Sequence, residues 1–340
     1  MTAVAQRSSP NTLTAQFSAY GNSGAGWTGA DSTYSTPLPD RRQLFTFSDT
    51  FLGPVSPDGT RPRTAPLINN AFVVRDRAGF TTVHGGTPDN PAAVLQSTDP
   101  GRWYWFGAGL ARRTTHEQIA VEFARTGPGP WDFTWVGTSL ARFAVDRLSE
   151  PVDVQPLPAA SRVTWSAWLQ QIGSHLYVYG VEDSSASKYL HVARVCGDSL
   201  LGAWSYWTGC GWSAKETDSA RILRGVANEY SVTPWRGRYL LVTHDTTELF
   251  SATIVAYTAA TPVGPFTGKT LLYTTPETGA AGSYANPNVY TYNAHAHPGL
   301  SRRSRLVISY NVNSLATDDV YHDATIYRPR FINAGRTLAT

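Results

Sequence analysis

The stretch VARVCGDSLLGAWSYW, residues 192–207, decides the fold, because two other stretches share its pattern. FARTGPGPWDF (residues 123–133) and VAYTAATPVGPFTGKTLLY (residues 255–273) also run from an apolar strand end through a small polar turn and a glycine to an aromatic residue. The three starts lie 69 and 63 residues apart, a period that fits into 340 residues about five times. Such self-similarity predicts an all-β, five-bladed β-propeller in a single domain.

The rest of the chain supports about four short strands in each blade. Runs such as AFVVRD (71–76), QIAVEFA (118–124) and RLVISYNVN (305–313) read as strands bounded by turn residues, and no long helical period is found. We therefore expect an N-terminal extension over residues 1–19 and the propeller over residues 20–335. Either the N-terminal segment or ATIYRPRF, near the C-terminus, is expected to close the ring.

Composition limits the classes of partner. Charged residues make up 16% of the chain, below the roughly 25% of ordinary soluble proteins, whereas aromatic residues reach 12%. This balance suits stacking on flat, neutral ligands such as sugars. The net charge is only +3, and the basic residues are scattered arginines with three lysines, so nucleic acid is not expected as a partner. No run of about 18 apolar residues occurs, so a membrane is not expected either. The oligomeric state is left open.

The two cysteines, Cys196 and Cys210, are spaced as in a loop closed by a disulfide. Such a bridge would stabilise the protein by about 3 kcal/mol in the chain-entropy model. Two buried free thiols are the alternative. A disulfide favours an exported protein, so we expect secretion, with the signal peptide absent from this sequence.

Several known catalytic motifs are incomplete or absent in this sequence. HEQIA at His116 lacks the second histidine of a zincin helix, and GAGLAR at Gly107 does not complete a dinucleotide fingerprint. Neither a GxSxG nucleophile elbow nor a Cys/His spacing typical of a metal site is present. Carboxylates remain as the chemical candidates.

Three acids stand where a solvated surface charge is not the simple explanation. Asp31 follows the glycine-rich GWTGA, Asp49 ends the apolar run QLFTFSD, and Glu229 begins NEYSVTPW, which we expect to be the innermost strand of a blade. The first strand of each blade lines the central channel, so acids at these positions converge near the axis. Glycosidic cleavage requires one carboxylic acid to protonate the leaving oxygen and one carboxylate as base or nucleophile. Each acid alone could instead be a cap or turn residue.

Five stretches, spread over most of the chain, carry a family resemblance: GWTGADSTYSTPLPDRRQLFTFSDTFLG (26–53), PLINNAFVVRD (66–76), WYWFGAG (103–109), NEYSVTPWRGRYLLVTHD (228–245) and YNAHAHPGLSRRSRLVISYNVNS (292–314). Together they resemble the bacterial domains of unknown function numbered 5005 and 4185, over residues ~20 to ~330. The latter group includes the endo-D-arabinanases of glycoside hydrolase family 183. Both are similar in turn to the five-bladed arabinanases and arabinofuranosidases of families 43 and 62.

The resemblance implies a glycoside hydrolase that cleaves a furanoside-rich polysaccharide of arabinan or arabinogalactan type, D-arabinan included, and that requires no cofactor. Asp31 corresponds to the opening acid of the first blade, and Asp49 to the acid of a (G/S)DTF signature, here with Ser48 where glycine is usual. Glu229 matches the glutamate of the family 43 triad by blade position and an E-x-S pattern. Likeness to family 43 favours inversion. The endo-D-arabinanases usually read TDLG where this chain reads ADSTY, which leaves the sugar open.

The segment NAHAHP places His295 and His297 on one side of an extended segment. They could hold a calcium or sodium ion in the central channel, bond a sugar hydroxyl, or bond neighbouring strands. The residues expected to bind substrate, each with packing as its alternative, are Trp27, Asn70, His295, His297, Tyr310 and Asn311.

A lectin-like propeller that binds glycans without cleavage is the main alternative function, with a propeller recruited to another reaction as a further one. The acid pair discriminates between enzyme and binder. A binder gains nothing from burying two carboxylates together, because their repulsion raises one pKa without benefit.

Overall fold

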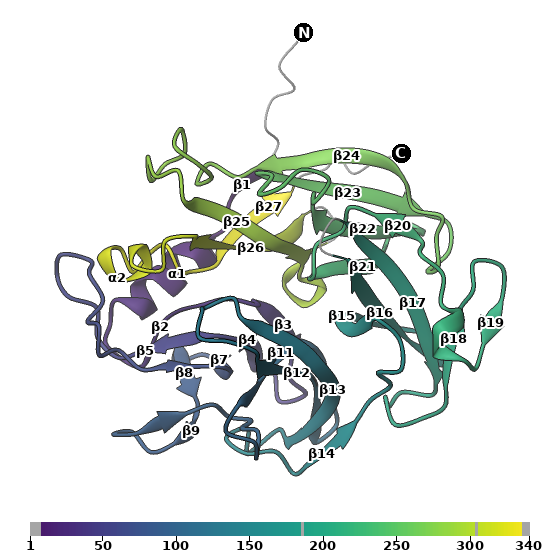
Figure 1. The fold of residues 1–340 in the computed structure, drawn as a ribbon, viewed down its shortest axis with the longest axis horizontal. Coiled ribbons are helices and arrows are strands. Elements are labelled where there is room, and N and C mark those ends of the chain that lie inside the picture. The colour runs from purple at the N-terminus through teal and green to yellow at the C-terminus, as the bar shows by residue number, and fades with distance from the viewer. Residues whose placement is uncertain (1–7, 185–186, 303–304, 335–340) are drawn as a thin grey trace, which may run out of the picture.

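The computed structural model describes residues 8–184, 187–302 and 305–334. Five antiparallel sheets surround a common centre (Figure 1), which confirms the predicted five-bladed propeller. The strands of the five blades, innermost strand first, are β3 (Tyr34–Pro37), β4 (Gln43–Phe47), β7 (Ala71–Arg75) and β8 (Phe80–Val83); β11 (Arg102–Arg112), β12 (Thr115–Arg125), β13 (Phe133–Ala144) and β14 (Asp153–Pro156); β15 (Val163–Ile172), β16 (His175–Asp183), β17 (Lys188–Cys196) and β18 (Trp204–Trp207), with β19 (Trp212–Ser213) and β20 (Leu223–Arg224); β21 (Tyr230–Trp235), β22 (Arg238–His244), β23 (Thr253–Ala259) and β24 (Thr267–Thr274); and β25 (Val289–Ala296), β26 (Leu306–Ser314), β27 (Arg330–Ala334) and β1 (Ser8–Pro10).

The first strands of the blades begin at residues 34, 102, 163, 230 and 289, which are 59 to 68 residues apart. The expected period is therefore present. The three stretches that indicated it do not occupy equivalent places, however. Residues 123–133 connect the second and third strands of their blade, whereas residues 192–207 and 255–273 connect the third and fourth. The same turn chemistry serves both connections, since each joins two antiparallel strands.

The N-terminal segment closes the ring. Strand β1 pairs with β27, so the last blade combines the two ends of the chain. Helix α1 (Thr12–Gly21) follows, capped by the Asn11 side chain, and buries Leu13 and Phe17. From Ser8 onward, the segment expected as an extension over residues 1–19 is thus part of the packed structure.

The core lies between neighbouring blades, which pack face to face. Both sides of an inner strand are then covered, and burial no longer alternates along it: residues 176–181 of β16 are all buried. Aromatic rings fill the spaces between blades. The ring of Phe72 in the first blade lies 5.1 Å from Phe106 and 5.2 Å from Phe143 in the second. This explains why the strands read as continuous apolar runs.

Smaller elements connect the blades. A three-stranded sheet is formed by β2 (Trp27–Ala30), β5 (Thr50–Leu52) and β6 (Leu67–Ile68), and Gly29 within it passes so close to Tyr327 that a Cβ would lie 2.2 Å from the Tyr327 carbonyl oxygen. Glycine at this position thus allows the backbones of β2 and of Tyr327 to pack closely together. None of the described helices is long and apolar enough to cross a membrane. The remaining elements are β9 (Gly85–Gly86), β10 (Pro91–Ala92), η1 (Glu216–Asp218), η2 (Pro298–Leu300) and α2 (Asp319–His322).

The predicted disulfide is wrong for this structure: Cys196 and Cys210 are free and exposed. The register explains why. Ala193 of β17 pairs with Tyr206 of β18. Cys196 lies three residues from Ala193 toward one end of this pairing, and Cys210 lies beyond the other end, in the β18–β19 turn. At about 3.3 Å per residue the thiols are more than about 10 Å apart, too far for a bridge.

Candidate active site

Asp31 and Asp49 are brought together by backbone pairing. Asp31 follows β2 and Asp49 precedes β5, and β2 pairs with β5. The Asp31 N–H donates to the Asp49 carbonyl oxygen at 3.3 Å, and the Ser48 N–H donates to the Asp31 carbonyl oxygen at 3.1 Å. On their other side, β3 and β4 form the hairpin whose turn contains PLPDRR. The hairpin thus returns the chain from Asp31 to Asp49.

The two side chains have different surroundings. Asp49 Oδ1 accepts from the Trp105 indole Nε1 at 2.7 Å and from the Asn69 amide at 3.0 Å. Asp31 Oδ2 accepts from the Tyr292 hydroxyl at 2.8 Å, and hydrogen bonding by the Tyr292 and Tyr327 hydroxyls lowers the pKa of Asp31. Asp31 Oδ1 is buried and has no partner of good geometry among the described residues. Asp49 is therefore held as an acceptor of two donors, whereas one oxygen of Asp31 is left unsatisfied.

Glu229 joins this pair from the fourth blade. It directly precedes β21, an innermost strand, as its sequence pattern predicted. Glu229 Oε1 accepts from the Ser32 hydroxyl at 2.5 Å and from the Asn293 amide at 2.9 Å. Glu229 Oε2 is buried 3.7 Å from His295 Nδ1 and has no hydrogen-bond partner in the part of the chain that the structure describes. The three predicted acids thus meet in one cluster, through Ser32, which directly follows Asp31.

Burial raises the pKa of every acid in the cluster, and the charge of a neighbouring carboxylate raises the pKa of Asp31 and Glu229 further. The pKa of Asp31 is raised by burial first and by the Asp49 charge second. Burial also raises the pKa of Asp49, against the hydrogen bonds from Trp105 and Asn69 and the nearby charge of Arg125. The pKa of Glu229 rises to about 8, through burial and the Asp31 charge. Glu229 is therefore a protonated acid at neutral pH and can donate a proton.

The two residues that hold Glu229 both have unusual backbones. Ser32 has φ 53° and Asn293 has φ 55°, in the left-handed region that side-chain-bearing residues rarely adopt. Such conformations cost free energy and persist where the surroundings impose them. Here each orients one donor toward the same carboxylate oxygen.

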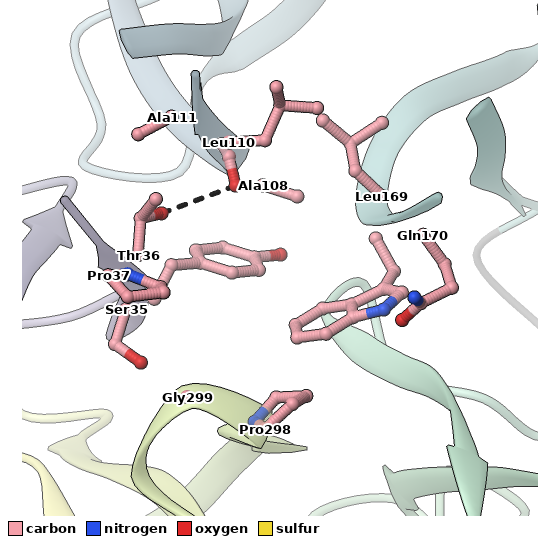
Figure 2. A pocket seen from close by; sticks show the side chains of 13 residues that line it. Ser35, Thr36, Pro37, Ala108, Leu110, Ala111, Leu169, Gln170, Pro298 and Gly299 are labelled. Carbon is pink, nitrogen blue, oxygen red and sulfur yellow. Dashed lines mark hydrogen bonds between the residues drawn. The ribbon is translucent and has the colours of Figure 1, made fainter. Parts of the chain in front are cut away.

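The opposite end of the propeller axis has a different character. A cavity of about 240 Å³ opens there, away from the acids, and is shown in Figure 2. It lies near Pro37, at the end of β3 farthest from Asp31. No carboxylate lines it. Its lining residues are mostly apolar and include Ala108, Leu110, Leu169, Pro298 and Gly299.

Between the two ends, aromatic rings fill the axis. The ring of Tyr34 stacks on His295 at 4.5 Å, and the Tyr34 hydroxyl donates to the Ala167 carbonyl oxygen at 3.0 Å. His295 Nε2 lies 2.9 Å from the Thr33 carbonyl oxygen, and burial lowers the pKa of this histidine to about 4. His297 lies between the hydroxyls of Ser35 and Ser309, each at 2.7 Å. Both rings are neutral and bonded to neighbouring strands, one of the alternatives left open above.

The expected central ion stays a prediction. Within residues 8–184, 187–302 and 305–334, no group of three or more His, Cys, Asp or Glu side chains is placed to hold a metal. Calcium takes six to eight oxygen ligands. The rings of Tyr34, Trp168 and His295 occupy the axis instead, with centroids 4.5 to 6.5 Å apart. The side chains present do not fit such an ion.

The other four expected substrate-binding residues are buried away from solvent. Trp27 packs in the core against Phe47, and the amide of Asn70 bonds the backbone of Leu95 and Tyr104. The Tyr310 hydroxyl donates to Glu277 Oε2 at 3.0 Å. Asn311 accepts from the Thr33 hydroxyl at 2.7 Å, and its Nδ2 lacks a partner. Each of the four residues is at most 2% exposed, which favours the packing alternative, and substrate binding by them stays a prediction.

Sequence analysis missed the residues that hold the acids: Asn69, Trp105, Tyr292, Ser32 and Asn293. Asn69 neighbours the residue that was chosen, Asn70. On an extended chain, adjacent side chains point to opposite sides, and the one that faces Asp49 is Asn69. The remaining donors come from other blades and give no local signal, although WYWFGAG and NAHAHP each contain one of them.

The chain is similar to one protein family in sequence and to several solved structures in fold. A family model described as domain of unknown function (DUF5005) matches residues 14–335. A solved structure described as a "putative hydrolase" from Bacteroides ovatus has a TM-score of 0.79 at 19% identity, over 98% of this chain and 92% of that one. It shares the fold. A GH43_1 enzyme from Xanthomonas citri (TM-score 0.49, 13% identity, 90% and 88% covered) and an alpha-L-arabinofuranosidase from Podospora anserina in complex with cellotriose (TM-score 0.49, 11% identity, 92% of each chain) align less well. No match to a curated protein was found.

Proposed function

The chain belongs to the family described as domain of unknown function 5005, and we propose that it is a glycoside hydrolase that uses the carboxylates of Asp31, Asp49 and Glu229. One observation carries the proposal: three acids from two blades meet with raised pKa values, and two of their oxygens have no hydrogen-bond partner among the described residues. Glycosidic cleavage needs an acid and a base of this kind on either side of the scissile bond.

Glu229 is the general acid in this proposal. With a pKa of about 8 it is protonated at neutral pH, and its free Oε2 can give a proton to the leaving oxygen. Ser32 and Asn293 fix the other oxygen and thereby the direction of the proton. His295, which is neutral, lies beside Oε2 and leaves the carboxyl group uncompensated by a positive charge.

Asp31 is the base, because its free Oδ1 can accept a proton from an attacking water when the carboxyl group is ionised. Asp49 does not need to touch the reacting atoms. Two donors stabilise its charge, and this charge raises the pKa of Asp31. Water activation by Asp31 on the face opposite Glu229 would give inversion, as the likeness to family 43 favours.

The substrate class is proposed from the sequence resemblance to the endo-D-arabinanases and to families 43 and 62. It is a furanoside-rich polysaccharide, of arabinan or arabinogalactan type. Such polymers are met outside the cell, so export of the mature protein is part of the proposal.

The test is to incubate the purified protein with D-arabinan, L-arabinan, arabinogalactan and xylan and to follow new reducing ends. NMR of the first products would report the configuration of the released anomeric carbon. We expect cleavage of at least one arabinose-containing polymer, with inversion. Binding to these polymers without any new reducing ends would instead establish the lectin-like alternative.

A further inference from the structure

Two exposed aromatic side chains lie on hairpins at the acid end of the propeller. Among the large hydrophobic side chains that are exposed in the described residues, only Trp131 (57%) and Phe250 (42%) are aromatic. Trp131 is in the connection from β12 to β13, and Phe250 is in the connection from β22 to β23. The pairings Arg102↔Ala124 and Tyr230↔Thr243 place both connections beside the starts of innermost strands, where the acids are.

The Trp131 connection leads to Asp49 through aromatic contacts. Phe133, two residues after Trp131, packs on Trp105 with a centroid distance of 5.1 Å. The indole of Trp105 is bonded to Asp49. The guanidinium of Arg125 lies 4.9 Å from the centroid of Trp103, close enough to Asp49 for its charge to lower the pKa of that acid. We call Trp131, Phe133, Trp103 and Arg125 the first flank.

The Phe250 connection leads to Asp31 in the same way. Phe250 packs on Tyr290 at 4.8 Å, Tyr290 packs on Tyr292 at 5.3 Å, and the Tyr292 hydroxyl is bonded to Asp31. Phe250 has φ 51°, which a bulky residue rarely adopts, and the neighbouring Leu249 is 87% exposed. The chain thus displays an aromatic ring at an unfavourable backbone position, which points to a function. Phe250, Leu249 and Tyr290 form the second flank.

The flanks approach the acid pair from opposite sides. The first blade, which carries Asp31 and Asp49, lies between the second blade and the fifth: β3 packs against β11 on one side, and Thr33 is bonded to His295 and Asn311 on the other. The first flank belongs to the second blade. The second flank joins the fifth blade through Tyr290 and Tyr292. The acids therefore stand in the middle of an aromatic line.

We propose that a glycan chain crosses the acid cluster from the first flank to the second, so that the bond presented to the acids is internal and the enzyme acts in endo fashion. This inference rests on the proposed hydrolytic function. Aromatic rings favour the apolar faces of sugars, and Arg125 supplies hydrogen-bond donors for hydroxyl groups. A site built for removal of terminal sugars would need such surfaces on one side only.

The experiment compares Trp131→Ala and Phe250→Ala with Leu201→Ala. Leu201 is also 42% exposed, but it lies in the connection from β17 to β18 at the opposite end of the propeller. Product sizes from the four polymers are followed from the first minutes. Affinity for each polymer is measured with the Asp49→Asn change added, so that hydrolysis does not interfere. We expect oligosaccharides before monosaccharide. Each aromatic variant should bind the cleaved polymer about three- to tenfold more weakly, whereas Leu201→Ala should match its parent.

The outcomes separate the two proposals. Release of monosaccharide alone, with both aromatic variants behaving as Leu201→Ala, would overturn the endo path and leave the hydrolase function standing. Binding that weakens in both aromatic variants, without cleavage by the parent, would support the glycan path across the acids but overturn the hydrolase function and, with it, the endo action. Loss of affinity in only one variant would overturn the two-sided path. Absence of both binding and cleavage with all four polymers would overturn both proposals.

Discussion

The two ends of the propeller axis are built from the same inner strands but differ in how their polar groups are satisfied. At one end, Asp31 Oδ1 and Glu229 Oε2 are buried without partners, and two residues with positive φ hold Glu229. Toward the other end, Tyr34 and His297 have their polar atoms bonded to neighbouring strands, above a mostly apolar cavity. At the cavity end these polar groups contribute to stability through hydrogen bonds. At the acid end the buried carboxylate oxygens lower the free energy of unfolding because they lack such bonds.

Unsatisfied buried carboxylates lower stability, because burial penalises their ionised form. Of the three such carboxylates among the described residues, Asp31 and Glu229 lie at the same end, and the proposed catalytic role gives a reason for their presence there. The contrast is not complete, because buried groups without a partner also occur toward the cavity. One is Trp168 Nε1, in the cavity lining. Another is Glu117, in the half of the second blade near the cavity, a buried acid with a raised pKa and an Oε2 that lacks a partner among the described residues. It offers a matched control for every claim about the cluster.

The largest effect is expected from removal of the acids. Asp31→Asn, Asp49→Asn and Glu229→Gln should each lower kcat by about 10²- to 10⁴-fold, because amides keep the shape but neither transfer the proton nor carry the charge. Initial rates on the cleaved polymer measure this. Glu117→Gln, across from Leu110 in the sheet and far from the cluster, should stay within about twofold of the parent. A comparable loss in Glu117→Gln would remove the distinction between the two ends.

The second effect concerns stability against pH. The pKa of Glu229 is about 8 when folded and about 4.5 when unfolded. The folded value is the higher one, so the favourable contribution of the protonated acid is lost as the pH rises from about 4.5 through 8. This amounts to on the order of 4 kcal/mol. Glu229→Gln, neutral at every pH, should therefore gain unfolding free energy over the parent at pH 9 relative to pH 5, measured by chemical denaturation.

Glu182 offers a control, because its pKa is shifted in the opposite direction to that of Glu229. Its pKa is lowered to about 2, mainly by the hydrogen bond from Arg221. Its favourable contribution is present above the unfolded pKa and is lost as the pH falls through the folded one. Glu182→Gln should therefore be less stable than the parent at pH 5 and pH 9 alike. An unchanged stability difference between pH 5 and pH 9 for Glu229→Gln would contradict the assignment of a raised pKa to Glu229.

A smaller effect is expected at Asn293, which donates to Glu229 Oε1. Loss of this donor removes an interaction that lowers the pKa of Glu229, so the alkaline limb of the kcat profile should move to higher pH, with kcat reduced about tenfold. Asn293→Gly loses the amide but accepts φ 55°, whereas Asn293→Ala also carries backbone strain. Both should shift the pH profile alike, and the alanine variant should be the less stable. An unmoved alkaline limb in both would exclude Asn293 as a positioning residue.

The smallest effect is expected in the ring-filled part of the axis. Tyr34→Phe removes the hydrogen bond to the Ala167 carbonyl oxygen and should lower the free energy of unfolding by about 1 kcal/mol, with kcat within twofold of the parent. Urea denaturation and initial rates measure the two quantities. A large loss of kcat without loss of stability would show that the satisfied part of the axis also contributes to catalysis.

The sequence by itself determined the five-bladed architecture and singled out three acids that the structure brings together. The blade period and the apolar strand runs follow from local chemistry, because turns and buried strands need particular residues at short range. Asp31, Asp49 and Glu229 were found because an acid beside an apolar strand or a glycine-rich turn conflicts with its surroundings. Ring closure uses both segments that were expected as alternatives, because β1 pairs with β27, which includes the end of ATIYRPRF.

Only the tertiary structure decided which neighbours hold those acids and which polar residues are simply packed. Asn69 rather than Asn70 faces Asp49, Tyr292 and Asn293 reach the cluster from another blade, and Trp27 and Tyr310 lie in the core. It also separated Cys196 from Cys210 by the register of one hairpin. Side-chain direction on a strand reverses at every residue, and contacts between blades join residues up to about 280 positions apart. A local sequence pattern predicts neither the side-chain directions nor the contacts between blades, because both depend on how the sheets twist and close into a ring.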